Sequence, residues 1–548
     1  MPVPKKNYRR RIYFNPPQQE VMFTGAHTTI FVGGRRLGKT HGVMAPWLLR
    51  NMQRMPGSSQ GLVFSTYKRG LMNTLPGTLQ AWESWGYKRD VHYYIGKKPP
   101  KTSGFAKPLI EPVDYSYVLS LYNGSIAYFI SQDRPGTSNS LTLDGVAGDE
   151  AKFLDYEKLK DETFPANGGT KAHFGDKPYH HSMLFVSDMP VGTKGSWFMN
   201  YEEQCDLELI EVIQGIIYEI WAKKEQLKKL RAEGKEPGYL VSHIKTLHKN
   251  LAQLQRVAVF YKEYSSIENM LILGESYINQ MKRDLTPLTF QTSILCKRIG
   301  ISKNGFYSSM REKHKYTCSD NSYLDKQDYN FKHLADESSL QDGDVNRELP
   351  ICIGMDYNSN INWIVAGQQE ERRINVLKSF YVKYERKLPE LVDDFCYYYR
   401  FHQCKEVIFY YDTTALGTNY AVNKEDIRFV VMQQFHKNGW KVRDVYVGNP
   451  MKHIEKYVLI NRMFKGQTDT QNVPYINEPN NEELILAIQT AGVYNGKKDK
   501  RGEKLAETEE NRLEYRTDGT DAFDTLLIGM EKFPQKHTFS IAITSSFM

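Results

Sequence analysis

A phosphate-binding loop near the start of the chain is the clearest group of residues that could do chemistry. Gly33 is followed, after four residues, by Gly38, Lys39 and Thr40, which completes a P-loop pattern. The run at 28–32 before it is β-branched and aromatic and predicts a buried strand. Because backbone N–H groups of such a loop surround phosphates at the start of a helix, the pattern predicts an ATP site. Lys39 would reach the β and γ phosphates, and the Thr40 hydroxyl would bind Mg²⁺.

Two adjacent carboxylates are candidates for the hydrolytic half of that site. Asp149 and Glu150 follow the short run of small apolar residues at 145–148, which predicts a strand. In a P-loop enzyme Asp149 would hold Mg²⁺ through water, and Glu150 would orient or deprotonate the attacking water. Adjacent acids are also common on protein surfaces, so this assignment depends on the P-loop upstream.

Other residues of the candidate ATP site are less specific. Arg35 and Arg36 lie inside the loop, where an arginine could stabilise charge on the transferring phosphoryl group. Arg134 could do the same for a neighbouring subunit, although all three arginines are also typical of an exposed surface. Gln18 and Gln19 stand upstream of the loop, where an adenine-reading glutamine would lie, and we take Gln19 as the candidate.

Four acidic residues in the second half of the chain predict another site. Asp356 and Asp412 each end a strand-like hydrophobic run, whereas Asp521 begins a predicted helix, with Asp524 one turn on. Cutting a phosphodiester with two divalent ions needs carboxylates from several chain segments. The order strand, strand and late helix is what an RNase H-like nuclease requires, so we predict that Asp356, Asp412 and Asp521 bind two Mg²⁺ or Mn²⁺ ions, helped by Asp524. Each acid alone is also typical of a strand end or a helix cap.

Composition leaves the partner open. The chain has 548 residues, a net charge of +8 and a pI near 8.8, which favours a polyanionic partner without proving one. The basic loop 497–501 either contacts a DNA backbone or forms a solvated hairpin tip. Six cysteines stand far apart, none in a Cys-x-x-Cys pair, which favours a reduced, cytoplasmic setting. We expect no membrane span and no signal peptide.

Strands that alternate with helical connections predict an α/β fold with a mostly parallel sheet. We place a P-loop ATPase domain at 1–300, a polar linker at 301–349, a nuclease domain at 350–535 and a tail at 536–548. A helical hairpin around 202–257 is predicted as an insertion, either structural or in contact with a partner or DNA. Its second half carries apolar residues at helical spacing: Leu240, Ile244, Leu247, Leu251 and Leu254.

Taken together, these motifs resemble the large terminase subunit of tailed double-stranded DNA bacteriophages, over most of the chain from about Asn15 to Gly529. The segment 144–151 matches the second ATPase motif of that family, and 187–190 is similar to its coupling motif. The loop matches the arginine-bearing loop of the family at Gly33, Gly34, Arg35, Arg36, Leu37, Gly38, Lys39 and Thr40.

The resemblance implies an ASCE-type P-loop ATPase joined to an RNase H-like nuclease, a motor that packages viral DNA and cuts it. Ser187 would sense the nucleotide and pass its state on. The implied partners are double-stranded DNA, the portal protein of the procapsid and a small terminase subunit, with a ring oligomer on the portal, no membrane, and the host cytoplasm as location. Two alternatives remain: an ATP-driven helicase or remodeller without nuclease activity, and a structural virion protein with a vestigial P-loop.

Overall fold

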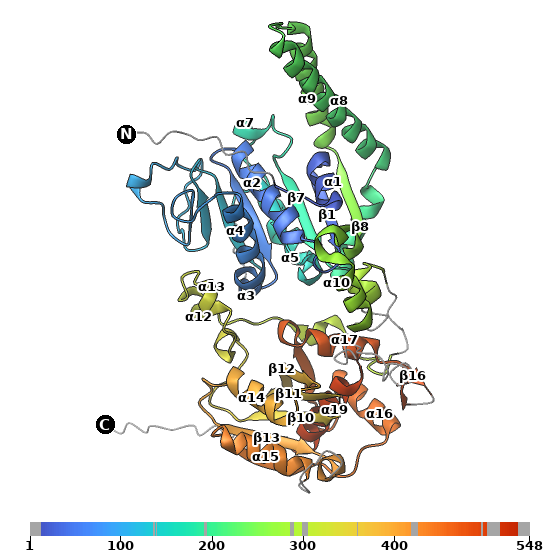
Figure 1. The fold of residues 1–548 in the computed structure, drawn as a ribbon. Coiled ribbons are helices and arrows are strands. Elements are labelled where there is room, and N and C mark those ends of the chain that lie inside the picture. The colour runs from blue at the N-terminus through green and yellow to red at the C-terminus, as the bar shows by residue number, and fades with distance from the viewer. Residues whose placement is uncertain are drawn as a thin grey trace, which may run out of the picture. The chain divides into compact units, whose positions relative to one another are not determined.

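The computed structural model describes most of the chain, and Figure 1 shows it as a ribbon. The predicted tail at 536–548 and Arg501 of the predicted basic loop lie outside the described residues. The described residues are 12–134, 138, 140–190, 194–284, 290–298, 305–358, 360–417, 426–494, 497–500 and 516–534.

The chain divides into two compact units. One is made of Met1–Gly300 and Asn321–Asp336, and the other of Ile301–Asp320 and Glu337–Met548. The segment 301–349, predicted as a linker, is therefore shared between the units. Its part that folds with the first unit contains the short helices α12 (Asn321–Asp325) and α13 (Phe331–Leu334).

The first unit is built on one sheet. Its described strands are β1 (Thr28–Gly33), β2 (Ser59–Phe64), β3 (Tyr93–Ile95), β4 (Val118–Leu121), β5 (Ile126–Ser131), β6 (Gly145–Gly148), β7 (Ser182–Ser187) and β8 (Val259–Tyr264). They are ordered β3-β4-β5-β2-β6-β7-β1-β8. From β5 to β8 along this order all neighbours are parallel, whereas β3–β4 and β4–β5 are antiparallel. The predicted α/β class with a mostly parallel sheet is confirmed.

Because β1, β7 and β6 are parallel neighbours, the predicted ATP-site residues that follow them lie at the carboxyl ends of adjacent strands. β1, which precedes the P-loop, and β6, which precedes Asp149 and Glu150, are separated by β7 alone. Strands β1 and β2 are buried along their whole length, as expected for parallel strands covered by helices on both faces. The described helices before the hairpin are α1 (Pro16–Thr24), α2 (Ala45–Arg54), α3 (Tyr67–Arg69), α4 (Leu75–Ser84), α5 (Tyr156–Lys158), α6 (Phe164–Ala166) and α7 (Lys171–Phe174).

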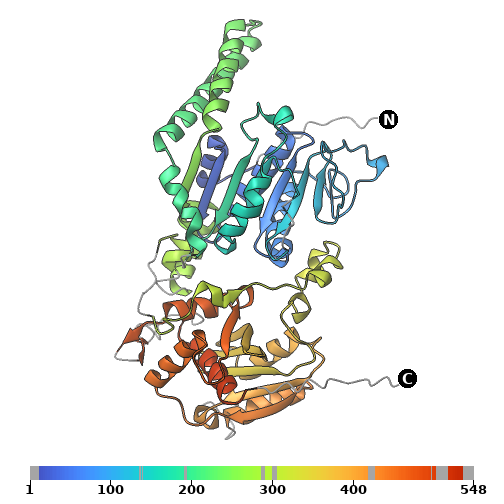
Figure 2. The same ribbon diagram turned by 180° about the vertical axis from the view of Figure 1, so that it is seen from behind.

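The helical hairpin predicted from the leucine spacing is present. It consists of α8 (Leu207–Ala232) and α9 (Gly238–Gln255), and α10 (Met270–Asp284) follows β8. Gly234 between the two long helices has a φ of 74°, a left-handed conformation that favours glycine. Figures 1 and 2 show the hairpin projecting away from the sheet of its own unit.

The second unit also has one main sheet. Its described strands are β9 (Lys315–Tyr316), β10 (Ile351–Tyr357), β11 (Ile361–Glu370), β12 (Arg373–Lys383), β13 (Glu406–Tyr411), β14 (Lys441–Tyr446) and β15 (Val473–Asn477), ordered β14-β13-β10-β11-β12-β15-β9. β10, β11 and β12 form an antiparallel meander, and β13 lies parallel to β10 on its other side. A second sheet of this kind is consistent with the RNase H-like domain that the sequence predicted. A small hairpin, β16 (Val493–Tyr494) and β17 (Lys497–Lys498), lies outside this sheet.

Helices cover both faces of the second sheet. They are α14 (Leu388–Tyr398), α15 (Ile427–Lys437), α16 (His453–Phe464), α17 (Glu482–Thr490) and α19 (Asp518–Lys532). Side chains alternate along β10: Ile351, Ile353 and Met355 pack with α14 and α15, whereas Cys352 packs with α16, α17 and α19. Among the described helices none has the length and apolar composition that a membrane span requires.

Candidate functional site

The predicted P-loop runs from β1 into a short π-helical turn, Thr40–Met44, that leads to α2. Arg36 and Gly38 have φ values of 63° and 81°. This left-handed conformation turns the chain sharply, and at position 38 glycine adopts it without the cost of a side chain. A loop of this kind at a helix start is a ready site for phosphate.

Two side chains from the start of α1 hold the carbonyl oxygens of the loop. Asn15 caps α1, and its Nδ2 also donates to the Leu37 carbonyl oxygen at 3.0 Å. Gln18 Nε2 donates to the carbonyl oxygens of Leu37 and Gly38 at 3.1 and 3.2 Å. The loop therefore keeps its shape through contacts made by the protein itself.

The structure does not bring Gln19 to this loop. α1 places Gln18 on its buried side, where the residue is 7% exposed. Gln19 is exposed, and its amide donates to the carbonyl oxygen of Phe14. Since the Gln18 amide is occupied by loop carbonyls, it acts as a positioning residue and is not free to read adenine.

A second pair of side chains, which sequence reasoning missed, comes from the segment after β8. Ser266 Oγ donates to the Arg35 carbonyl oxygen at 2.6 Å, and Asn269 Nδ2 donates to that of Arg36 at 2.8 Å. Asn15 Nδ2 also donates to Asn269 Oδ1 at 3.0 Å, which joins the two pairs. These residues are uncharged and buried, and no motif marks them. The fold alone brings them to the loop.

Lys39 already has an acidic partner. Its Nζ donates to the Gly33 carbonyl oxygen at 3.0 Å and forms an ion pair with Asp188. Lys152 Nζ lies 3.6 Å from the other carboxylate oxygen of Asp188. Burial alone would raise the pKa of Asp188, but Lys39 and Lys152 together hold it below its ordinary value. A nucleotide phosphate would therefore compete with Asp188 for the Lys39 ammonium group.

The predicted coupling residue Ser187 ends β7 immediately before Asp188. It is buried, and its Oγ accepts a hydrogen bond from the backbone N–H of Lys152 at 3.1 Å. Lys152 stands two residues after Glu150. The hydroxyl thus links the end of β7 to the segment that carries the candidate catalytic acid, and its sensing role stays a prediction.

Asp149 is brought to the P-loop as predicted from the motif. Thr40 Oγ1 donates to Asp149 Oδ2 at 3.2 Å, and Thr74 Oγ1 donates to the same oxygen at 2.8 Å. Burial raises the pKa of Asp149, while Thr74 and Lys39 favour its ionised form. A hydroxyl and a carboxylate in contact beside a P-loop are the oxygen ligands that Mg²⁺ prefers, so these residues fit the ion.

Glu150 has the environment of a general base. Its backbone has a φ of 50°, and its Oε2 is buried without a hydrogen-bond partner among the described residues. Burial first, and then the charge of Asp188, raise the pKa of Glu150 to about 7. A carboxyl with this pKa and a free oxygen can take a proton from water near neutral pH.

The two candidate arginine fingers differ in their surroundings. Arg35 is half-buried in the loop, as its motif predicts. The Arg134 guanidinium lies between the rings of Tyr67 and Tyr117, 4.3 and 4.6 Å from their centroids, and its Nη2 is 2.9 Å from Asp325 Oδ1. These contacts within its own unit hold the guanidinium in place, and a role of Arg134 towards a neighbouring subunit stays a prediction.

In the second unit the sheet brings Asp356 and Asp412 together. Gly354 of β10 and Tyr410 of β13 are paired in a parallel ladder. Asp356 and Asp412 stand two residues further along each chain, so they occupy corresponding positions on one face, where neighbouring strands lie about 4.8 Å apart. Tyr410 packs in the core cluster that contains α19, and this face is therefore the α19 face.

The helix α19 lies directly on β10, because Gly354 has no side chain. A Cβ atom at Gly354 would stand 2.4 Å from the Ala522 carbonyl oxygen. At the start of the helix, a Cβ atom at Gly519 would stand 3.0 Å from the ring of Trp363. Trp363 is the β11 residue that pairs with Asp356. The first turn of α19 therefore lies beside Asp356.

These carboxylates share one electrostatic field. Burial raises the pKa of Asp356 well above its ordinary value, and the charges of Asp521 and Asp518 raise it further. Burial also raises the pKa of Tyr357, followed by the charges of Asp412 and Asp356. Asp356, Asp521 and Asp518 are thus neighbours, whereas the charge of Asp412 is felt at Tyr357, the residue after Asp356.

Asp518 was missed by sequence reasoning. Its Oδ1 accepts a hydrogen bond from Asn358 Nδ2 at 3.1 Å, while its Oδ2 is buried without a hydrogen-bond partner among the described residues. It stands three residues before Asp521. Asp524 was predicted because it stands three residues after Asp521. The same helical spacing before Asp521 identifies Asp518.

Lysines of the β16–β17 hairpin and of the residues just after it form ion pairs with Asp521 and Asp524. Lys498 Nζ donates to Asp521 Oδ1 at 2.8 Å and to Asp524 Oδ2 at 2.6 Å, and Lys500 Nζ donates to Asp521 Oδ2 at 2.7 Å. Tyr307 donates to the other oxygen of Asp524 at 2.7 Å. Both oxygens of the fully buried Asp524 are therefore used within the core, so the structure does not place it as a metal ligand. Lys498 is likewise buried, which corrects the prediction of a solvated tip at this point.

The fit of this cluster to divalent cations is partial. Within the part of the chain that the structure describes, no group of three or more His, Cys, Asp or Glu side chains is arranged to hold a metal ion. Asp356 and Asp518 nevertheless suit a cation, since the first is crowded by like charges and the second has an unpartnered oxygen. Asp521 differs, because Lys498 and Lys500 already neutralise it.

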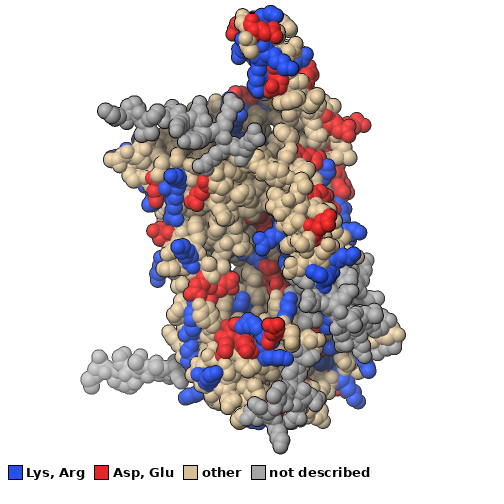
Figure 3. All heavy atoms as spheres, in the orientation of Figure 1, with Lys and Arg blue, Asp and Glu red and all other residues tan. Residues whose placement is uncertain are grey.

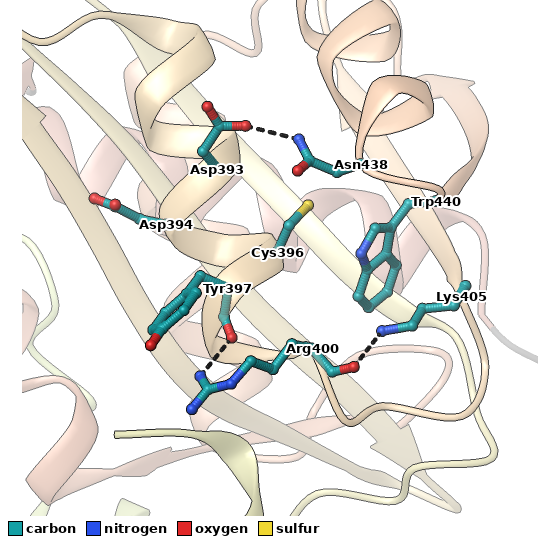
Figure 4. A pocket seen from close by; sticks show the side chains of 8 residues that line it. All are labelled: Asp393, Asp394, Cys396, Tyr397, Arg400, Lys405, Asn438 and Trp440. Carbon is teal, nitrogen blue, oxygen red and sulfur yellow. Dashed lines mark hydrogen bonds between the residues drawn. The ribbon is translucent and has the colours of Figure 1, made fainter. Parts of the chain in front are cut away.

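A cavity of about 570 Å³ lies beside α14, on the other side of the sheet from α19 (Figure 4). Asn438 Nδ2 donates to Asp393 Oδ1 at 2.7 Å, and Lys405 Nζ donates to the Arg400 carbonyl oxygen at 2.9 Å. Its polar groups thus bond to one another, and no predicted site residue lines it. The lining residues are Asp393, Asp394, Cys396, Tyr397, Arg400, Lys405, Asn438 and Trp440.

Comparisons with known proteins give remote likenesses. No protein-family model and no curated protein sequence matches the chain. The large terminase of a thermophilic bacteriophage in complex with ADP is similar in structure, with 12% identity, a TM-score of 0.37, and coverage of 95% of this chain and 100% of that one. The ATPase domain of the Thermus phage P74-26 large terminase covers 53% of this chain and 94% of its own, at 12% identity and a TM-score of 0.30. The function therefore has to rest on the residues of the two sites.

Proposed function

We propose that this protein is the large subunit of a viral DNA-packaging motor, an ATPase that drives double-stranded DNA into a procapsid and a metal-dependent endonuclease that cuts it. The observation that carries the proposal is the presence of two separate sets of reactive residues on one chain. One is the P-loop with Lys39, Thr40, Asp149 and Glu150 around it. The other is the carboxylate cluster around Asp356 on an RNase H-like sheet.

For ATP hydrolysis, Glu150 acts as the base. A water oxygen attacks the γ phosphorus, the bond from that phosphorus to the ADP oxygen breaks, and the water proton passes to Glu150. Lys39 leaves Asp188 for the phosphates, where its charge stabilises the transferring group. Thr40 and Asp149 would hold Mg²⁺, which supplies charge neutralisation on the phosphates.

For DNA cleavage, Asp356, Asp412 and Asp521 would hold divalent cations, Mg²⁺ or Mn²⁺, with Asp518 beside them. Such ions supply Lewis-acid stabilisation of the phosphodiester oxygens. Asp521 can contribute once Lys500 releases one of its oxygens, and the buried Lys498 stays with Asp524. The raised pKa of Asp356, caused by burial and by neighbouring acids, favours a bound cation there.

The partners follow from the same proposal. A packaging ATPase acts on double-stranded DNA at the portal protein of a procapsid, with a small terminase subunit, as a ring oligomer in the host cytoplasm. Ser187, through its bond to Lys152, would pass the nucleotide state to the rest of the first unit.

Purified protein incubated with plasmid DNA, with Mg²⁺, with Mn²⁺ and with EDTA, tests both halves when ATP turnover is followed in the same tube. The proposal expects metal-dependent cleavage that Asp356→Ala abolishes while ATP turnover stays. If Asp356→Ala leaves every activity intact, a helicase or remodeller is the better assignment. If Lys39→Ala and the native protein both stay at background ATP turnover, the P-loop is vestigial.

A further inference from the structure

The α8–α9 hairpin contains none of the residues assigned to either site. Its two helices bury their facing sides against each other and leave the outer sides in solvent. The buried residues of the pair are Ile210, Ile213 and Ile220 of α8 and Leu240, Ile244, Leu247, Leu251 and Gln255 of α9. Packing within the hairpin and, at its base, against α1 thus accounts for these buried side chains and leaves the outer side chains to be explained.

An aromatic pair stands on the outer side of α8. Trp221 is 57% exposed and Tyr218 is 69% exposed, and their ring centroids lie 5.8 Å apart. All seven tryptophans of the chain are described, and Trp221 is the exposed one. An indole left in water is unusual for a residue that is highly buried on average, and it is typical of contact surfaces.

Positive charge gathers on the same side. Lys224 follows Trp221 by one helical turn. Burial lowers the pKa of His248 on α9, and the charges of Lys224 and of Arg54 on α2 lower it further. Since α8 and α9 pack side by side, Lys224 and His248 lie near one another, and both are exposed, as is Arg54.

The lysines of this surface lack acidic partners. Lys224, Lys245 and Lys249 are exposed and form no ion pair with any described residue. Four acids of the hairpin, in contrast, are paired elsewhere: Glu219 with His243, Glu225 with Lys228, Glu233 with Lys235, and Glu236 with Arg231. Figure 3 shows Lys, Arg, Asp and Glu side chains crowding the hairpin. The three lysines thus stand outside the ion pairs of the hairpin.

We propose that this basic flank, defined as Trp221, Lys224, Lys245, His248, Lys249 and Arg54, binds the phosphate backbone of double-stranded DNA. The inference rests on the proposed function and adds a contact surface to it. Lys245 and Lys249 are four residues apart, about 6 Å along the helix axis, while a DNA strand carries one phosphate per roughly 3.4 Å. Phosphates would relieve the repulsion among these cations, and the Trp221 and Tyr218 rings would pack against the sugars.

The test compares two triple variants with the same change in net charge. In one, Lys224→Ala, Lys245→Ala and Lys249→Ala remove unpaired lysines of the flank. In the control, Lys160→Ala, Lys177→Ala and Lys235→Ala remove exposed lysines that are paired with acids. Binding of a fluorescent duplex of about three helical turns is measured by anisotropy over a range of salt concentrations. ATP turnover without DNA reports that each variant is folded.

The flank variant should lower the slope of log Kd against log salt by about 2 to 3 units, since each lost phosphate contact removes roughly 0.9. The control variant should keep the native slope. DNA should also quench the fluorescence of Trp221, a change that Trp221→Phe removes. If the native protein binds DNA and both variants keep its slope, the flank does not bind DNA, and the proposed function stands. If the native protein does not bind DNA, the proposed function fails together with the inference.

Discussion

The loop around Lys39 and the carboxylates around Asp356 each prepare a place for a charged ligand, and they do so differently. At the loop, four neutral buried side chains hold the backbone carbonyls, and Asp188 pairs with the lysine that would meet a phosphate. Around Asp356, several carboxylates lie close together, and the lysines form ion pairs with two of these acids, Asp521 and Asp524. The first site is organised before its ligand arrives, whereas the second is short of positive charge. Substitutions at the two sites should therefore affect different reactions and should change the stability of the protein to different extents.

The largest expected effect separates them by reaction. Glu150→Gln removes the group that accepts the water proton, so ATP turnover should fall by about 10² to 10⁴-fold with little change in KM. Metal-dependent plasmid cleavage should continue at the native rate. Steady-state ATPase kinetics and a nicking assay on the same preparation measure both. A variant that hydrolyses ATP at the native rate would show that another residue activates the water.

The next effect concerns the stability of the acid cluster. Lys456 and Lys498 both pair with Asp521 and Asp524, and Lys498 is the fully buried one. Lys498→Met should cost roughly 3 to 5 kcal/mol of unfolding free energy. Lys500→Met removes a half-buried partner of Asp521 and should cost about 1 kcal/mol or less. Urea unfolding followed by tryptophan fluorescence compares the two variants. Equal losses would contradict the difference in burial on which the comparison rests.

A smaller effect tests the organisation of the P-loop. Asn269→Ala removes the bond to the Arg36 carbonyl oxygen, and loss of one buried hydrogen bond of about 1 to 2 kcal/mol should raise the KM for ATP roughly 5- to 30-fold. The rate at saturating ATP should change little, because Glu150 stays in place. Ser265→Ala is the matched control, since Ser265 bonds to Glu268 and to the backbone of Ile267 and not to the loop. A loss of kcat with unchanged KM would place Asn269 in the reaction itself.

The smallest expected effect is in the pH dependence. With a pKa raised to about 7 by burial and by Asp188, Glu150 is protonated and inactive at lower pH. The kcat/KM for ATP should therefore rise as the pH increases towards about 7, because this ratio reports the free enzyme. Asp188→Asn removes the weaker of the two causes of the raised pKa. The rise of kcat/KM should then shift slightly to lower pH. If kcat/KM of the native protein instead rises at the ordinary pKa of a glutamate, the burial of Glu150 would be contradicted.

Sequence patterns were most informative where the chemistry requires residues at a fixed spacing within one segment. The P-loop, the acids after β6 and the strand-end acids Asp356 and Asp412 follow from such local patterns, and so does the hairpin from its apolar spacing. Contacts made across the fold were not accessible in this way. Ser266 and Asn269 are ordinary polar residues until the segment after β8 folds back onto the loop.

Two pairs of residues show what local spacing cannot decide. Gln18 and Gln19 are adjacent and chemically identical, and the turn of α1 decides which one is buried. Asp518 and Asp524 stand one turn on either side of Asp521. Which of them faces Asp356 and which faces Lys498 depends on the close approach of α19 to Gly354, which no helical pattern records.

A single set of assays tests the central claim that two independent reactive sites share this chain. ATP turnover and Mn²⁺-dependent plasmid cleavage are measured in one tube for the native protein, Glu150→Gln and Asp356→Asn. We predict that Glu150→Gln loses ATP turnover and keeps cleavage, while Asp356→Asn loses cleavage and keeps ATP turnover. Loss of both activities in either variant, or cleavage by Asp356→Asn at the native rate, would contradict the account.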